Sequence, residues 1–324
     1  MKKLLILLLL GVPLASCDLT GDEFLAPQNS SALTEEMVFS DSIRTTAFLT
    51  RIYSDIGVDF ELGIWSSHGN INQATDDAEY TLSSPTQTAV IHYSGTLNPA
   101  TYASDGNMNL YWRMPYENIR RVNMLIANID RSPLTQATKT RMLAEARFLR
   151  AWYYAGLMKR YGGVPILENK VFTALDVVNV PRNTYAECVE YVVNELDAVA
   201  AVLQEPQQQP DQFYGRANAG AALGLKSRVL LYAASPLFNG GAIEVAKGTP
   251  VEPIISYPNY DVARWQRAAD AAQELINKGW YSLHVNNETA PGYGFYEVFL
   301  RRGECKRNCV THFFNGFFDV TALA

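Results

Sequence analysis

Three acidic residues lie close together in the first third of the chain, at Asp76, Asp77 and Glu79. Glycoside hydrolases use two carboxylates about 5 to 10 Å apart to cleave a glycosidic bond. Asp76 and Asp77 are adjacent in sequence, and adjacent side chains rarely face the same reacting bond. We therefore favour capping or hydrogen bonding to a ligand, and keep catalysis by Asp76 or Asp77 as the alternative.

Aromatic residues are interspersed in and just after this polar region, at Trp65, Tyr80, Tyr111 and Trp112. Such residues can form a platform on which the apolar face of a ligand stacks, and core packing is the alternative for each of them. Trp65 is the strongest candidate for ligand contact, because its neighbours are Ser, His, Gly and Asn rather than an apolar stripe.

The spacing Cys305-x3-Cys309-x2-His312 is compatible with zinc, but no second ligand pair accompanies it. A disulfide or two free thiols are the alternatives that we prefer, and we predict no metal site. Cys188 falls on an apolar stripe and is predicted to be a core residue. No nucleotide-binding glycine motif, nucleophile elbow or His-Glu-x-x-His motif occurs, so we predict no cofactor and no catalytic residue.

Composition excludes several classes of protein. The 324 residues are 48% hydrophobic and 19% charged, which excludes wholesale disorder. The formal net charge is −6, and no nucleic-acid partner is expected on that balance. Four cysteines in a chain of this length do not make a disulfide scaffold.

The first residues predict export and a lipid anchor. A short positive head, Met1–Lys3, precedes an apolar run from Leu4 to Leu10, too short to span a membrane. Leu14-Ala15-Ser16-Cys17 matches a lipobox, which predicts a signal peptide over 1–16 and acylation of Cys17. A plain signal peptide is the alternative. Residues 17–33 are expected to form a flexible tether that anchors the protein to a membrane without spanning it.

Apolar periodicity predicts a helical body with few strands. The expected helices cover 34–56, 107–130, 135–161, 184–203, 217–234 and 262–278, with an irregular excursion over 57–106. Pro115 must kink or split its helix, and Thr184 with Glu187 forms a capping box. Trp152, Trp265 and Trp280 lie within or beside helices and are predicted to be core residues.

Three blocks of sequence carry a resemblance to the SusD/RagB family. The blocks are Ala144–Tyr154 with Arg160–Pro165; Gly215–Ala217 with Leu225–Asn239; and Tyr260–Asp261 with Trp265 and Gly279–Leu283. Glu145, Arg147 and Arg150 punctuate an otherwise apolar helix in the first block, so we expect them to be buried or half-buried partners in ion pairs and caps. The most recognisable block is therefore predicted to be scaffold rather than ligand site.

The resemblance implies a mainly α fold of tetratricopeptide-like helix pairs, an α-α superhelical scaffold with long irregular excursions. It also implies an outer-membrane, lipid-anchored nutrient-binding protein that captures glycans for a SusC-like TonB-dependent transporter. By position in the family, residues 60–112 supply the glycan-binding candidates. They are Trp65, Asn72, Gln73, Asp76, Asp77, Tyr80 and Trp112.

Family members are considerably longer, so the resemblance implies a SusD-like helical domain over 34–300 that is incomplete at its C-terminal end. An atypical tail over 301–324 follows it. Three functions remain open at this point. The first is non-catalytic glycan binding, the second is a lipid-anchored helical glycoside hydrolase, and the third is a structural partner that only docks to the transporter.

Overall fold

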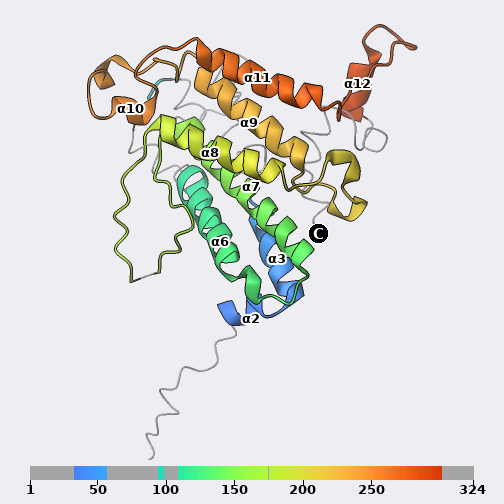
Figure 1. The fold of residues 1–324 in the computed structure, drawn as a ribbon. Coiled ribbons are helices and arrows are strands. Elements are labelled where there is room, and N and C mark those ends of the chain that lie inside the picture. Colours follow the sequence, from blue (N-terminus) through green and yellow to red (C-terminus); the bar gives the residue numbers. More distant parts are fainter. Residues whose placement is uncertain (1–32, 57–93, 97, 99–108, 174, 301–324) are drawn as a thin grey trace, which may run out of the picture. The chain divides into compact units, whose positions relative to one another are not determined.

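Helices dominate this computed structural model, which describes residues 33–56, 94–96, 98, 109–173 and 175–300 (Figure 1). The chain divides into two units, Met1–Val38 and Phe39–Ala324. The described ranges contain an isolated β-bridge between Asn239 and Tyr257. The α-helices are α2 (Glu35–Phe39), α3 (Ser42–Tyr53), α6 (Met114–Asn128), α7 (Gln136–Tyr161), α8 (Tyr185–Ala200), α9 (Ala219–Ala234), α10 (Glu252–Ile255), α11 (Ala263–Asn277) and α12 (Tyr293–Leu300). A mainly α fold is confirmed.

The single helix expected over 34–56 is wrong, because the chain breaks before Asp41 and forms α2 and α3. Asp41 has an extended backbone, and its side chain accepts a hydrogen bond from the Arg44 N–H at 2.8 Å. Such a cap satisfies a backbone donor that has no partner within the helix. No Glu or Gln follows Asp41 three residues later, so the sequence lacks the reciprocal half of the signal.

Pro115 splits its segment, as predicted. Asn109–Arg113 form a π-helical turn, η4, and α6 begins at Met114 with Pro115 in its first turn. Proline has no N–H to donate, and the first turn of a helix is where that donor is not needed. The break places Trp112 in η4, immediately before Arg113, the N-cap residue of α6.

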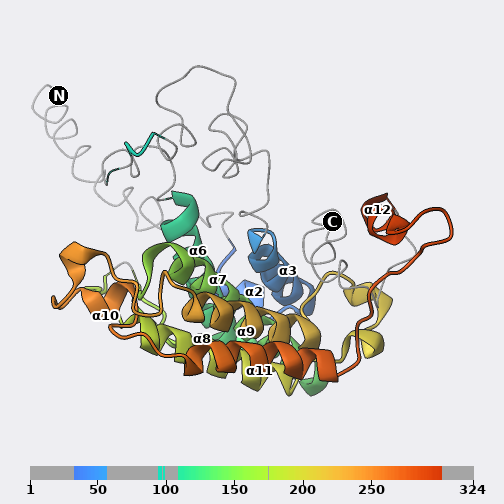
Figure 2. The ribbon, with the colours of Figure 1, turned by 90° about the horizontal axis from the view of Figure 1, so that it is seen from above.

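Helix α7 is the central element. It packs against α3, α6, α8 and α9, and both Phe148 and Leu157 are buried within these contacts (Figures 1 and 2). Thr135 begins the helix by accepting a hydrogen bond from the Thr138 N–H. Gly162 ends it with a φ of 72°, a left-handed conformation that favours glycine. The predicted bounds and the central position of this helix are confirmed.

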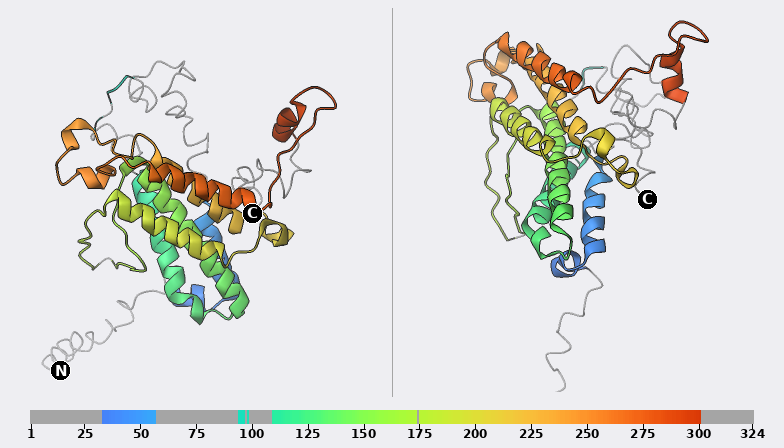
Figure 3. Two further views of the ribbon diagram at one scale, coloured as in Figure 1. Left: turned by 45° about the horizontal axis from the view of Figure 1, so that its top comes forward. Right: turned by 45° about the vertical axis from the view of Figure 1, so that its right-hand side comes forward.

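Helices α6, α7, α8, α9 and α11 follow one another in space as in the chain, each packed against the next (Figure 3). The capping box at Thr184 and Glu187 begins α8 with both reciprocal hydrogen bonds present. Ala268 and Ala271 are the buried residues of α11, and their short side chains allow close approach to α9. The array of stacked helix pairs agrees with the predicted tetratricopeptide-like body.

The prediction that Trp265 is a core residue is wrong, since the residue is 36% exposed. Helix α11 lies at the edge of the array (Figure 2), so only the face that carries Ala268 and Ala271 is covered. Trp152 and Trp280 are half-buried. Helix α12 was not predicted from the sequence.

Two ionic clusters join the helices, as predicted for Glu145, Arg147 and Arg150. The Glu145 and Arg150 side chains are buried, and the Arg147 side chain is half-buried. On α8, Glu195 pairs with Arg147 at 2.7 Å and with Arg150 at 2.9 Å. Arg150 also donates to the side chain of Asn123 on α6 at 2.8 Å. The first cluster therefore connects α6, α7 and α8.

The second cluster surrounds Glu145, whose side chain is 2% exposed. Its carboxylate accepts hydrogen bonds from Tyr53 on α3 at 3.0 Å and from Arg216 at 3.1 Å, and it also pairs with Arg141. Arg216 belongs to the second sequence block and Glu145 to the first. Residues of these two blocks therefore hold parts of the helical scaffold together.

Glu195 is expected to make stability depend on pH. Burial by itself raises the pKa of this carboxyl, but hydrogen bonds and charge from Arg147 and Arg150 outweigh it, so the net pKa is lowered from 4.5. A lowered pKa contributes stability that is complete above the ordinary glutamate value and is lost as pH falls through the lower folded-state value. Urea midpoints measured between pH 7 and pH 3 should fall towards acid, and Glu195→Gln should flatten that fall. If the urea midpoint of Glu195→Gln depended on pH as steeply as that of the unmodified chain, a lowered pKa of Glu195 would not be the cause of the fall.

Candidate functional site

Trp112 is the one predicted glycan-binding residue that lies in the described part of the chain. The other glycan-binding candidates, the lipidation site and the residues weighed for catalysis or zinc fall outside it: Cys17, Trp65, Asn72, Gln73, Asp76, Asp77, Glu79, Tyr80, Cys305, Cys309 and His312. No helix among the described residues is long and apolar enough to cross a membrane. The described residues also contain no group of three or more His, Cys, Asp and Glu placed to hold a metal ion.

Cys188 is buried, and its thiol bonds to the carbonyl of Val164 at 3.4 Å. Burial raises the pKa of the thiol to about 11, so the thiolate needed for reaction is scarce at neutral pH. The predicted core role of Cys188 is confirmed.

The indole of Trp112 is held in place by two other rings. Tyr161, at the end of α7, meets it edge to face with centroids 5.0 Å apart at 86°. Tyr116, on the first turn of α6, lies at 5.1 Å with a tilt of 54°. Edge-on and tilted arrangements are the favoured geometries of aromatic pairs. All three residues are half-buried, so part of this aromatic cluster remains open to solvent.

The ring of Tyr116 is itself anchored. Its hydroxyl donates to the carbonyl of Pro165 at 2.9 Å, and its ring meets that of Tyr154 at 6.4 Å and 90°. Burial raises the pKa of Tyr116, which therefore stays a neutral donor. The hydroxyl of Tyr154 in turn accepts from the Leu167 N–H at 2.9 Å. Trp112 thus rests on side chains fixed by the scaffold, which lowers the entropy cost of using its ring in binding.

A cation lies beside the cluster. The guanidinium of Arg160 sits 3.7 Å from the centroid of the Tyr111 ring, within the range of a cation–π contact. Tyr111 is buried and immediately precedes Trp112 in η4. This contact ties η4 to the last turn of α7. The π-helical turn therefore has a fixed position on the helical body.

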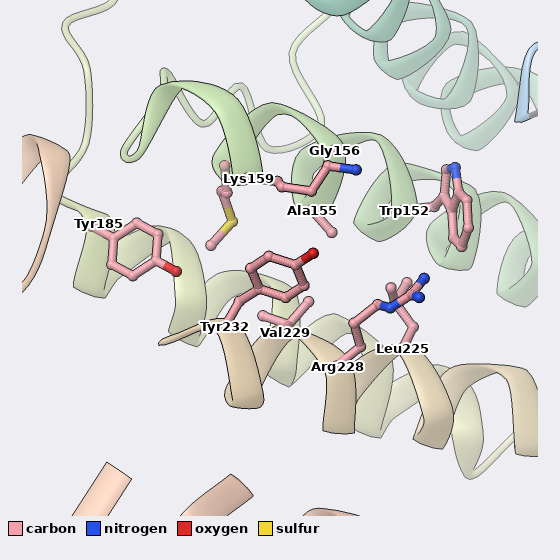
Figure 4. Close-up of a pocket in the computed structure, with 10 residues that line it drawn as sticks. Trp152, Ala155, Gly156, Lys159, Tyr185, Leu225, Arg228, Val229 and Tyr232 are labelled. Carbon is pink, nitrogen blue, oxygen red and sulfur yellow. The ribbon is translucent and has the colours of Figure 1, made fainter. Parts of the chain in front are cut away.

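A cleft between α7 and α9 is a feature that the sequence reasoning missed (Figure 4). Its volume is about 60 Å³, and Trp152 and Lys159 on α7 face Arg228 and Tyr232 on α9. The sequence held one signal for it, Gly156 in the middle of an otherwise strong helix pattern. Glycine inside a helix costs stability and calls for a reason.

The family model described as SusD-like, starch-binding and associating with the outer membrane matches residues 24–231. A SusD-like protein of Bacteroides ovatus is 30% identical over 142 residues, which are 43% of this chain and 25% of that protein. The starch-binding protein SusD of Bacteroides thetaiotaomicron is 32% identical over 124 residues, which are 38% of this chain and 20% of that protein. The matched part of the chain thus spans a quarter or less of the length of these relatives.

The fold agrees with this match. A solved laminarin-binding SusD-like protein aligns with a TM-score of 0.56 at 20% identity, over 76% of this chain and 45% of that one. At this identity the likeness concerns the fold alone. The family model, in contrast, covers most of the chain and includes the first block and most of the second. The chain belongs to the SusD-like family of starch-binding proteins that associate with the outer membrane.

Proposed function

We propose that this chain binds a glycan without cleaving it, and that Trp112 supplies one of the surfaces on which a sugar ring stacks. The observation that carries the proposal is the aromatic cluster of Trp112, Tyr116 and Tyr161, fixed by the scaffold and partly open to solvent. A flat ring presented in this way matches the apolar face of a pyranose.

The remaining binding groups come from the segment that precedes η4. Trp65 and Tyr80 add ring faces, and the side chains of Asn72, Gln73, Asp76 and Asp77 hydrogen-bond sugar hydroxyls. These residue types match the polar and aromatic composition of the excursion. A family described as starch-binding supports a sugar as the ligand. A solved SusD-like protein is described as laminarin-binding, which supports a sugar ligand that differs among SusD-like proteins.

The protein acts at the outer membrane in this proposal. Acylation at Cys17 anchors it, residues 17–33 form the tether, and a SusC-like TonB-dependent transporter receives the captured glycan. The lipobox at Leu14–Cys17 and the outer-membrane association of the family support this arrangement. Metabolic labelling with a palmitate analogue, lost in Cys17→Ala, tests the anchor. Retention of the label in that variant would contradict it.

Trp112→Ala is expected to weaken glycan binding roughly two- to tenfold, since aromatic contacts contribute about 0.5 to 1.5 kcal/mol. Gel retardation in starch, laminarin and other embedded polysaccharides measures the effect. Trp265→Ala is the matched control, because Trp265 is an exposed tryptophan on α11, away from η4. Equal losses in both variants, or no loss in Trp112→Ala, would contradict the role of the cluster.

A further inference from the structure

A cavity lies between the first turns of α7 and the connection from α8 to α9, residues 201–218. Its volume is about 550 Å³, which is within the ordinary range for sites that bind small molecules. The residues of α7 that line it run from Gln136 to Glu145, whereas Tyr161 of the aromatic cluster ends the same helix. At the helical rise of about 1.5 Å per residue, Glu145 and Tyr161 are separated by about 24 Å along α7. The cavity is therefore distinct from the site around Trp112.

One aromatic ring lines the cavity and is held from the side of α7. The guanidinium of Arg141 lies 4.0 Å from the centroid of the Phe213 ring, a cation–π contact that joins α7 to the α8–α9 connection. Phe213 is half-buried, and it lines the cavity. The part of its ring that Arg141 does not cover is therefore available to a ligand.

The segment that carries Phe213 is fixed by one glutamine. The side-chain amide of Gln209 donates to the carbonyls of Phe213 at 2.9 Å and of Arg216 at 3.2 Å. The oxygen of the same amide accepts a hydrogen bond from the Asn218 side chain at 3.1 Å. The Phe213 ring is thus positioned before any ligand arrives, which lowers the entropy cost of binding.

The cavity carries its charge as an ion pair. Among the described residues that line it, the charged side chains are Arg141 and Glu145, which pair with each other. A charged ligand would lose its water without meeting an opposite charge that needs a partner. A purely apolar ligand would leave hydroxyls and amides of the lining without water. An uncharged molecule with several hydroxyl groups matches the other polar side chains, which all offer a donor and an acceptor: Gln136, Thr138, Thr140, Gln204 and Gln209.

We propose that this cavity is a second glycan-binding site, which takes one uncharged sugar ring of a polysaccharide. The apolar face of the sugar packs on Phe213, and its hydroxyls bond to the side chains of Thr140 and Gln204. The site rests on the proposed function, because glycan capture supplies the ligand, but it does not use Trp112. A polysaccharide that reaches both sites gains affinity from the raised effective concentration at the second contact.

Saturation-transfer NMR identifies the class of ligand on the full chain carrying Trp112→Ala, in which stacking at the first site does not contribute. The probes are methyl α-glucoside, methyl β-glucoside, methyl β-galactoside, methyl α-mannoside and methyl β-glucuronide. We expect at least one of the four uncharged glycosides to bind about threefold or more tightly than the glucuronide, with no loss of binding in added salt. Tighter binding of the glucuronide would overturn the proposal, as would the absence of binding by all four uncharged glycosides.

Variants in the same background place the sugar in the cavity. Phe213→Ala should weaken binding of that glycoside roughly two- to tenfold through the lost ring contact. Gln204→Ala should have an effect of similar size through a lost hydrogen bond, and because Gln204 is exposed the variant should keep its fold. Gln273→Ala is the matched control, since Gln273 is an exposed glutamine on α11, and it should leave binding unchanged. Undiminished binding in folded Phe213→Ala and Gln204→Ala proteins would overturn the proposal.

Failure of the second site can be told apart from failure of the proposed function. If Phe213→Ala and Gln204→Ala leave glycoside binding unchanged while Trp112→Ala alone weakens retardation in polysaccharide gels, only the second site is overturned. If Trp112→Ala alone has no effect on retardation but Phe213→Ala weakens it, the second site stands and the role of Trp112 is contradicted.

Discussion

Glu145→Ala is expected to lower the free energy of unfolding by about 3 to 5 kcal/mol. Its carboxylate is 2% exposed and accepts from Tyr53 and Arg216, which belong to segments far apart in the chain. Its removal leaves the Arg216 guanidinium, only 11% exposed, without its charge partner. Urea denaturation followed by circular dichroism measures the change. A fall in Tm of about 4 to 8 °C should accompany it.

Glu190→Ala is the matched control for this ionic cluster. Glu190 pairs with Arg267, but their side chains are 49% and 43% exposed. Solvent screens an exposed pair, so the loss should stay below about 1 kcal/mol. If Glu145→Ala and Glu190→Ala lowered the free energy of unfolding by similar amounts, burial of the Glu145 cluster would not be what makes its ion pairs stabilising.

Gly163→Ala is expected to cost about 3 kcal/mol or more. A Cβ at this position would overlap the carbonyl oxygen of Asn183 and would lie 2.8 Å from the backbone nitrogen of Tyr185. Both are backbone atoms at the start of α8, so relief requires the helix to shift. The same urea measurement reports this loss.

Gly156→Ala, in α7 itself, is expected to have the opposite effect on stability to Gly163→Ala, just after the end of that helix. Its Cβ would meet nothing within 4 Å, and alanine is the better helix former, so the variant should gain about 0.5 to 1 kcal/mol. Destabilisation by Gly156→Ala, or tolerance of Gly163→Ala, would contradict the packing described for these glycines.

Local signals made much of the fold predictable. Thr135, Thr184 and Gly162 mark helix ends through contacts with residues three or four positions away, and the sequence shows both partners. The burial of Glu145 and Arg150 was predictable as well, because charged residues on an apolar helix must find partners. Which partners they find was not predictable. Tyr53 lies 92 residues from Glu145 in the chain, and only the assembled helices bring them together.

The candidate site was less accessible to sequence reasoning. Trp112 was predicted from residue type and from its place after the excursion, but its orientation depends on Tyr161 at the far end of α7. Trp265 was assigned to the core because it lies within a helical pattern, and periodicity alone does not reveal that α11 is at the edge of the array. The cleft beside Gly156 arises where α7 and α9 face each other, a pairing that no local spacing encodes.

Glycan capture without cleavage is the central claim, and one measurement tests it most directly. The full chain is run through gels that contain a panel of polysaccharides, and the same polysaccharides are assayed for new reducing ends after incubation with it. We predict retardation by one class of glycan with no reducing ends released. Release of reducing ends that is lost in Asp76→Asn or Asp77→Asn would contradict the claim and establish a hydrolase. A folded chain that no glycan retards would contradict capture itself.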